Sequence, residues 1–268
     1  MAEPAAPGHP LPSHMPIGAV RVAALTLSDA VAMIWDRIIG LESRGFSIHF
    51  CNAYTVALAE RDADYASCLN DADLVCADGT PVVWAQRWLH RQTPQHSSRV
   101  YGPDVMEAIL ARSEETPSPG ARHYLLGATP DVLEALRVRI QRTWPHAHVV
   151  GWESPAFRTP THAELLARDE RISSSGANVV WVGLGTPKQD FEVARIAARL
   201  PVVALGVGAA FDFLAGTTPQ APQWMQRSGT EWLYRLATEP RRLAPRYFWG
   251  NPLFISVILR QRVRSPRA

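Results

Sequence analysis

Two hydrophobic periodicities alternate along the chain from residue 30 to residue 205. Short continuous apolar runs predict buried strands, and segments with an apolar residue at every third or fourth position predict helices. The predicted strands are residues 46–51, 74–77, 122–126, 148–152, 178–182 and 202–205, and the predicted helices are residues 30–43, 54–69, 82–90, 105–112, 129–142, 163–173 and 187–200. This alternation predicts a Rossmann-like α/β fold, in which helices flank a mostly parallel sheet.

The two ends of the chain depart from this alternation. Residues 1–16 contain five prolines and no periodicity, which predicts a disordered leader. After residue 216, the helical pieces 221–227, 231–237, 241–249 and 253–263 follow with no strand-like run between them. We therefore expect an α/β domain over residues 17–216 and a helical C-terminal appendage over residues 217–268. No apolar run approaches the roughly 20 residues that a membrane-spanning helix needs.

The charge distribution adds a possible partner to this picture. The whole chain has a net charge of only +2, but the residues from Arg235 onward hold eight arginines against one acid, Glu239, which gives +7 there and leaves −5 for the rest. Such a basic segment suggests a polyanion, a phosphate or an anionic membrane surface as its partner. Its arginines are interspersed with Trp, Tyr and Phe, which suits a membrane interface. The alternative is a terminal helix pair that docks on the domain and turns its arginines to solvent.

Neither the cysteines nor the clustered acids indicate a metal site. Cys51, Cys68 and Cys76 lack both paired and metal-ligand spacing, so we expect them to be small buried residues in a reducing cytosol. Two Asp-Ala-Asp triplets, at residues 62–64 and 71–73, invite a metal-binding interpretation. That motif should follow an apolar strand directly, whereas the first triplet lies in a predicted helix and the second precedes its strand. We therefore favour solvated charge at helix ends and predict no obligatory metal.

Asp78 is the strongest candidate for chemistry. It follows the apolar strand 74–77 and precedes Gly79, and Thr80-Pro81 is typical of the cap and first turn of a helix. Ligands of open α/β sheets bind at the carboxyl ends of the strands, so this carboxylate should face a crevice. Gly79 would let a ligand approach the backbone closely. The alternative is that Asp78 only caps the helix that follows.

Two glycine-containing turns also follow predicted strands. The first runs from Gly183 through Gly185 to Lys188, and the second contains Gly206 and Gly208. Backbone N–H groups at such turns can face an anion, and Lys188 adds positive charge. Each turn alone is a weak dinucleotide signal, but together they favour nucleotide or phosphate binding. An NAD-dependent oxidoreductase is therefore an alternative, although neither turn has the full fingerprint or an acid about 20 residues further on.

Short motifs along the chain carry a more specific signal. They are Asn52, Ala77-Asp78-Gly79-Thr80-Pro81, Arg99-Val100-Tyr101-Gly102, Gly183-Leu184-Gly185-Thr186-Pro187-Lys188-Gln189, Gly206-Val207-Gly208-Ala209-Ala210-Phe211-Asp212-Phe213 with Gly216, Ala221-Pro222, Glu231-Trp232-Leu233-Tyr234-Arg235-Leu236, Glu239-Pro240-Arg241-Arg242-Leu243 and Arg246-Tyr247. In this order and spacing they resemble the WecG/TagA/CpsF glycosyltransferase family, from about residue 17 to residue 247.

This resemblance implies an inverting, metal-independent enzyme that moves a sugar from a UDP-sugar to a polyprenyl-diphosphate-linked sugar. It also implies surface-polysaccharide or exopolysaccharide biosynthesis at the cytoplasmic face of the plasma membrane, with the protein attached peripherally. We expect no cofactor beyond the donor and no nucleic-acid partner. The oligomeric state stays open, a homo-oligomer included.

The resemblance also implies roles for individual residues. Asp78 matches the proposed general base, and Arg99 matches an active-site arginine. The implied substrate-binding residues are Asn52, Gly79, Gly102, Gly183, Gly185, Lys188, Gln189, Gly206, Gly208 and Asp212, with Arg235, Arg241, Arg242 and Arg246 expected to meet the diphosphates. Two departures concern donor or acceptor identity: Phe50 replaces a frequent Thr, and Asp190 replaces the usual Glu after Gln189. A non-catalytic membrane-binding scaffold that retains a nucleotide fold is a third interpretation.

Overall fold

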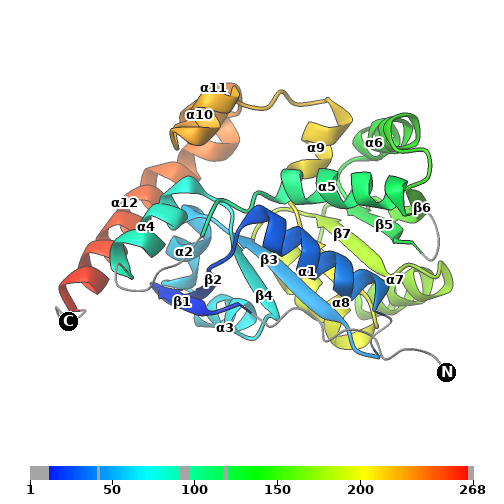
Figure 1. The fold of residues 1–268 in the computed structure, drawn as a ribbon, viewed down its shortest axis with the longest axis horizontal. Coiled ribbons are helices and arrows are strands. Elements are labelled where there is room, and N and C mark those ends of the chain that lie inside the picture. Colours follow the sequence, from blue (N-terminus) through cyan, green and yellow to red (C-terminus); the bar gives the residue numbers. More distant parts are fainter. Residues whose placement is uncertain (1–11, 41–42, 91–96, 117–119, 265–268) are drawn as a thin grey trace.

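A computed structural model describes residues 12–40, 43–90, 97–116 and 120–264, and in this part of the chain a sheet of eight strands lies between layers of helices (Figure 1). The strands are β1 His14–Ile17, β2 Val20–Ala23, β3 Phe46–Cys51, β4 Leu74–Ala77, β5 Arg122–Gly127, β6 His148–Glu153, β7 Val179–Gly183 and β8 Val203–Gly206. Their order is β1-β2-β4-β3-β8-β7-β5-β6, and every neighbouring pair is parallel except β1 and β2. The predicted Rossmann-like α/β fold is thus confirmed.

The central strands are buried on both faces because helices cover both sides of the sheet. In β4, for example, Leu74 and Cys76 pack in one core cluster, whereas Val75 and Ala77 pack in another. The helices α1 Leu27–Ile39, α5 Gly102–Glu115, α6 Pro130–Thr143 and α9 Ala210–Ala215 contribute to the first cluster. On the other face lie α2 Ala53–Ala59, α3 Ala63–Asn70, α4 Thr80–Leu89, α7 His162–Ser174 and α8 Lys188–Arg199. This explains why the central strands appear in the sequence as continuous apolar runs.

The strand order reverses between β3 and β8. The connection that leaves β3 leads to β4 on one side of the sheet, whereas β8 is entered from β7 on the other side. Ligands of open α/β folds bind in the crevice at such a reversal, beyond the carboxyl ends of the strands. Asn52 follows β3, Asp78 follows β4 and Val207 follows β8, so the candidate residues converge at this edge.

The single helix predicted over residues 54–69 is wrong, because the structure divides this segment into α2 and α3. Asp62 has an extended backbone between the two helices, and its carboxylate accepts a hydrogen bond from the N–H of Tyr65 at 3.0 Å. Asp is a strong N-cap residue, so this acid starts a new helix instead of continuing the previous one. The first Asp-Ala-Asp triplet therefore begins a helix.

The predicted disordered leader over residues 1–16 is corrected in its last residues. His14–Ile17 forms the edge strand β1, which pairs with β2, and neither strand was predicted. Pro16 is compatible with this position, because an edge strand tolerates a residue without an N–H donor. Residues 1–11 lie outside the described residues, so this part of the leader stays a prediction.

The C-terminal segment forms α10 Gln223–Arg227, α11 Glu231–Thr238 and α12 Pro240–Arg264. The two helices predicted over 241–249 and 253–263 are one helix, which contains Pro245 and Pro252. An interior proline usually costs about 3 kcal/mol, so tertiary packing must offset it. Phe254, Val257 and Ile258 supply such packing, because they are buried in the cluster that holds α2 and α4 side chains. The domain division at residue 216 stays a prediction.

Candidate active site

A cavity of about 770 Å³ opens where the carboxyl ends of β3 and β4 face the C-terminal helices. Its polar end contains Asp78 and Arg99 together with residues from the C-terminal helices. The predicted residues that line it are Asn52, Asp78, Gly79, Arg99, Arg235 and Arg246. Chain segments that are far apart in the sequence therefore form one site.

Asp78 is held by the backbone of the segments around it. Its N–H donates to the carbonyl of Cys51 at 2.9 Å, and its Oδ1 accepts from the N–H of Gly102 at 3.2 Å. The alternative that Asp78 caps the following helix is wrong, because Gly79 is the N-cap of α4 and Asp78 bonds instead to the first residue of α5. The carboxylate is thus fixed toward the cavity by two neighbouring elements.

The pKa of Asp78 is raised, and burial is the largest cause. The negative charge of Glu231 raises this pKa further, whereas Arg99, the N–H of Gly102 and the side chain of Asn52 lower it. Burial disfavours the charged form of a carboxyl group, and nearby donors restore it in part. A carboxylate with a raised pKa is a stronger base, which matches the needs of proton transfer near neutral pH.

Arg99 connects Asp78 to the C-terminal helices. Its Nε donates to the carbonyl oxygen of Asp78 at 2.8 Å, and its Nη2 pairs with Oε2 of Glu231 at 2.6 Å. The guanidinium also lies over the ring of Tyr101, 3.8 Å from the centroid, and the Tyr101 hydroxyl donates to Oε1 of Glu231 at 3.0 Å. Both carboxylate oxygens of Glu231 are therefore engaged. These contacts tie α11 to the segment that carries Asp78.

Two arginines from α11 and α12 add positive charge to the cavity. Arg246 donates to the carbonyl oxygen of Thr186 at 3.4 Å and stacks on Tyr54, 5.1 Å from the ring centroid. Arg235 pairs with Glu239 at 3.7 Å, and its buried Nε has no hydrogen-bond acceptor among the described residues. A buried donor without an acceptor is costly, so an anionic ligand at this point would satisfy it.

Gln189 joins the two glycine turns. Its Oε1 accepts from the N–H of Gly185 at 3.1 Å, and its Nε2 donates to the carbonyl of Gly206 at 2.8 Å. Gly185 and Gly208 have positive φ angles, +76° and +56°, which favour glycine at both turns. The side chain predicted to bind substrate therefore has both polar atoms committed to the backbone, where it holds the turns in place.

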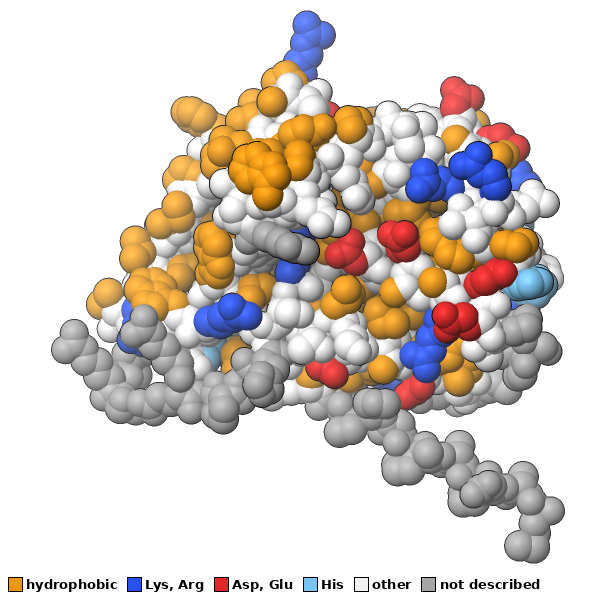
Figure 2. Space-filling view, turned by 45° about the horizontal axis from the view of Figure 1, so that its top comes forward, with side chains coloured by type: hydrophobic (Ala, Val, Ile, Leu, Met, Phe, Trp, Pro, Cys, Tyr) orange, Lys and Arg blue, Asp and Glu red, His pale blue; other side chains and the backbone are white. Residues whose placement is uncertain are grey.

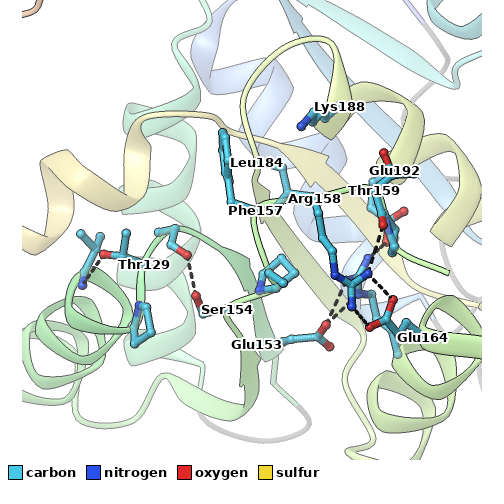
Figure 3. A pocket seen from close by; sticks show the side chains of 18 of the residues that line it. Thr129, Glu153, Ser154, Phe157, Arg158, Thr159, Glu164, Leu184, Lys188 and Glu192 are labelled. Carbon is cyan, nitrogen blue, oxygen red and sulfur yellow. Dashed lines mark hydrogen bonds and ion pairs between the residues drawn. The ribbon is translucent and has the colours of Figure 1, made fainter. Parts of the chain in front are cut away.

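A second cavity, of about 1100 Å³, lies at the carboxyl ends of β5, β6 and β7 (Figure 3). Of the predicted residues, Gly183, Lys188 and Asp212 line it. The loop 154–160 forms another part of its wall, and the Nζ atom of Lys188 lies 4.9 Å from the ring centroid of Phe157. The turn 183–188 separates this cavity from the first, because Thr186 lines the first and Lys188 lines the second.

Residues 15–268 match the model of the glycosyl transferase WecG/TagA/CpsF family. The chain belongs to this family. Membership supports a glycosyltransferase and confirms the family resemblance seen in the sequence motifs. It also decides against the NAD-dependent oxidoreductase, which the two glycine turns had left open.

Some of the residues implied by the family motifs lie away from both cavities. Arg241 is exposed and lines neither of them, and the side chain of Arg242 lies outside the described part of the structure. Gln189 holds the two glycine turns, one of which contains Gly206 and Gly208. Gly102 supplies the N–H donor to Asp78. The positions of these residues indicate that several family motifs shape the site without lining it.

Phe50 does not line the first cavity, although a Thr there would have supplied a hydroxyl. The side chain is buried in the core cluster beneath Gly102, and a Cβ on Gly102 would lie 3.7 Å from its ring. Phe50 therefore packs under the turn that carries the N–H donor to Asp78.

Glu231 is the functional candidate that sequence reasoning missed. The segment containing it was interpreted through its arginines, yet its carboxylate contacts both Arg99 and Tyr101. One signal was available: Glu231 and Glu239 are the two acids in an otherwise basic and aromatic stretch, residues 231–249. An isolated acid among arginines is a good candidate for an ion pair, but its partner 132 positions away could not be identified from sequence alone.

Within the described residues, no group of three or more His, Cys, Asp or Glu side chains is arranged to hold a metal ion. Three of the four acids of the Asp-Ala-Asp triplets, Asp62, Asp71 and Asp73, have other partners. Asp62 caps α3, and Asp73 accepts from the N–H of Ser47 at 2.8 Å and pairs with Arg44 at 2.7 Å. In the same part of the chain, no helix is both long and apolar enough to cross a bilayer.

Proposed function

We propose that this glycosyltransferase moves a sugar from a UDP-sugar onto a hydroxyl of a polyprenyl-diphosphate-linked sugar, with inversion and without a metal ion. The observation that carries the proposal is Asp78, a carboxylate with a raised pKa that lines a cavity shared with Arg99, Arg235 and Arg246. A base and several cations in one cavity are what such a reaction requires.

The proposed reaction begins with the acceptor hydroxyl. Asp78 takes its proton while the hydroxyl oxygen forms a bond to the anomeric carbon of the donor. The bond from that carbon to the β-phosphate oxygen breaks, and UDP leaves with the electron pair. Because the acceptor attacks from the face opposite to UDP, the anomeric configuration inverts. General-base catalysis of this kind typically contributes about 10²–10⁴-fold to the rate.

Negative charge that develops on the leaving UDP needs compensation. Arg246 is suited to this role because it lines the first cavity and donates to the carbonyl of Thr186, in the turn between the two cavities. Charge-assisted hydrogen bonds from arginine to phosphate are about twice as strong as neutral ones. Preorganised donors of this kind stabilise a transition state without a metal ion.

The second cavity is suited to the nucleotide of the donor. Lys188 begins α8 and lines this cavity with Gly183 and Leu184, and Asp212 lies in the first turn of α9. Since the turn 183–188 forms a wall of both cavities, a UDP-sugar could extend across it from the nucleotide to the reacting carbon. We infer that the diphosphate crosses this turn, near Thr186 and Arg246.

Exposed apolar side chains support peripheral attachment to a membrane. Trp224 is 67% exposed, Leu233 45% and Phe248 88%, and they belong to α10, α11 and α12. Figure 2 shows hydrophobic side chains gathered over the upper left of the molecule, where these helices lie. Aromatic side chains next to arginines suit the interface of an anionic bilayer. We expect Trp224, Leu233 and Phe248 to enter this interface.

A panel of UDP-sugars tests this function directly. UDP-N-acetylmannosamine, its uronic acid, UDP-glucose and UDP-glucuronic acid are each incubated with a short-chain prenyl-diphosphate-linked sugar, and products are identified by mass spectrometry. We expect one donor to give a disaccharide product with release of UDP, and NMR of the new linkage to show inversion. Transfer and donor hydrolysis that both stay at background with every donor would instead favour a non-catalytic scaffold.

A further inference from the structure

An apolar groove continues from the catalytic cavity between α4 and α12. Pro81, Trp84 and Trp88 line it from α4, spaced three or four residues apart, so that they share one face of the helix. The lining residues of α12 include several at a similar spacing: Leu243, Tyr247, Asn251, Phe254, Ile255, Ile258 and Leu259. The groove follows α12 for about 24 Å, at 1.5 Å per residue from Leu243 to Leu259.

The charged residues that line this groove all lie at one end of it. Its charged lining residues are Asp78, Arg99, Glu231, Arg235 and Arg246, which all belong to the catalytic end. From Asn251 to Leu259, the α12 residues that line it are uncharged, and the α4 residues Trp84, Ala85 and Trp88 that line it are apolar. The cavity thus has a cationic head and an apolar tail, which is the complement of an amphiphile with an anionic headgroup.

Large side chains in the tail of the groove are left uncovered. Trp84 is 52% exposed, Ile255 57% and Leu259 51%. Phe254 and Ile258, on the same helix, are buried against the body of the protein. Helix packing therefore accounts for only part of the apolar face of α12. The uncovered part runs along the groove toward the arginines and is available to a hydrocarbon chain.

We infer that this groove binds the first isoprene units of the lipid acceptor, with the acceptor's diphosphate at Arg235, whose buried Nε has no acceptor among the described residues, and its sugar hydroxyl at Asp78. This inference rests on the proposed function, but it specifies the path of the chain, which enters along α12 between Trp84 and Leu259. A branched unsaturated chain fits an aromatic and aliphatic wall, because the burial of its apolar surface is favourable. A chain bound in this groove places the sugar of the acceptor next to Asp78.

Direct binding tests the groove without turnover. Calorimetry compares farnesyl diphosphate with inorganic diphosphate on the full chain. We expect farnesyl diphosphate to bind at least tenfold more tightly and Leu259→Asp to remove most of this difference. The matched control is Val263→Asp, the same change one turn further along α12, at a residue that is 85% exposed and does not line the groove. We expect this control to bind like the unmodified chain.

Acceptor kinetics then test whether bound chains are productive. A farnesyl-diphosphate-linked sugar is compared with the same sugar diphosphate carrying a methyl group, in solution and without vesicles. We expect Trp84→Ser and Leu259→Asp each to raise the KM of the farnesyl acceptor about tenfold and to leave the KM of the methyl acceptor and UDP binding unchanged.

Three outcomes overturn the inference: equal binding of both diphosphates, equal effects of the variants on both acceptors, or the same loss in Val263→Asp. Failure of the proposed function looks different, because the unmodified chain would then transfer no sugar to either acceptor whatever the calorimetry shows. Circular dichroism and the unfolding midpoint of each variant identify a change that acts through folding.

Discussion

Arg99 and Glu231 form an ion pair of 2.6 Å across 132 positions of sequence, and this pair lies beside the proposed base Asp78. Arg99 lowers the pKa of Asp78, whereas Glu231 raises it, although burial is the larger cause of the upward shift. The two members of the pair therefore shift the pKa of Asp78 in opposite directions. It also gives α11 a defined attachment to the catalytic cavity.

Glu231→Gln should shift the acid limb of the pH–activity profile to lower pH. Asp78 must be ionised to accept a proton, so activity is lost as the pH falls through its raised pKa. Removal of the Glu231 charge lowers that pKa and leaves Arg99 without its anionic partner. The measurement is kcat/KM as a function of pH, with Glu134→Gln, in a surface pair on α6, as the control. An unchanged or upward-shifted acid limb would contradict the proposed coupling.

Asp78→Asn should abolish transfer while UDP-sugar binding is retained. The amide oxygen can still accept from the N–H of Gly102, so the local fold should persist. Loss of the base should lower kcat by about 10²–10⁴-fold. The measurements are single-turnover transfer and a thermal shift with UDP. Asp64→Asn, on the exposed face of α3, is the matched control.

The same Asp78→Asn variant should be no less stable than the unmodified protein at neutral pH. A carboxyl group whose pKa is raised on folding is destabilising when ionised, and this cost disappears as the pH falls through its pKa. Urea unfolding at neutral and at mildly acidic pH checks the sign. We expect any stability advantage of the variant to shrink as the pH falls, and a marked loss of stability at neutral pH would argue against it.

Substitutions of the adjacent α8 residues Lys188 and Gln189 should distinguish a ligand-binding role from a structural role. Gln189→Met removes both bonds to the glycine turns and leaves the half-buried N–H of Gly185 and the buried carbonyl of Gly206 without this partner, so it should cost about 1–3 kcal/mol of unfolding free energy. Lys188→Met should leave that free energy nearly unchanged and weaken UDP binding, because Lys188 lines the second cavity. Urea unfolding and UDP titration measure the two effects. Equal destabilisation by both variants would contradict the division of roles.

Phe248→Asp should weaken binding to vesicles that contain anionic lipid. The residue is 88% exposed on α12, so an acid there should affect the fold little while it opposes insertion and repels the anionic surface. Co-sedimentation should show several-fold less bound protein. Leu166→Asp, at an exposed residue of α7, is the control. Truncation before Glu239 is a poorer test, because it would remove Phe254, Val257 and Ile258 from the core.

Chelation should leave turnover unchanged. The proposal assigns charge compensation to arginines and backbone N–H groups, so EDTA should affect neither kcat nor the KM of the donor. The assay is the same transfer reaction with and without chelator after dialysis. Activity that falls with EDTA and returns with a divalent cation would exclude the metal-independent mechanism.

The sequence by itself determined the central architecture. Apolar runs predicted the strands β3 to β8, and those of the central strands are nearly continuous because helices cover both faces of the sheet there. Asp78 and Asn52 could be placed at strand ends for the same reason, since the end of such a run marks the carboxyl edge of the sheet. The family motifs added the identity of the fold and of the enzyme class.

Tertiary structure alone decided how distant segments meet. Glu231 could be seen in the sequence but not its contact with Arg99, and Gln189 appeared to be a ligand contact until its two backbone bonds were known. The sequence predicted two helices over residues 241–249 and 253–263, but burial of one face against α2 and α4 keeps α12 continuous. In each case the deciding energy comes from contacts between residues far apart in the chain, and local periodicity carries no information about such contacts.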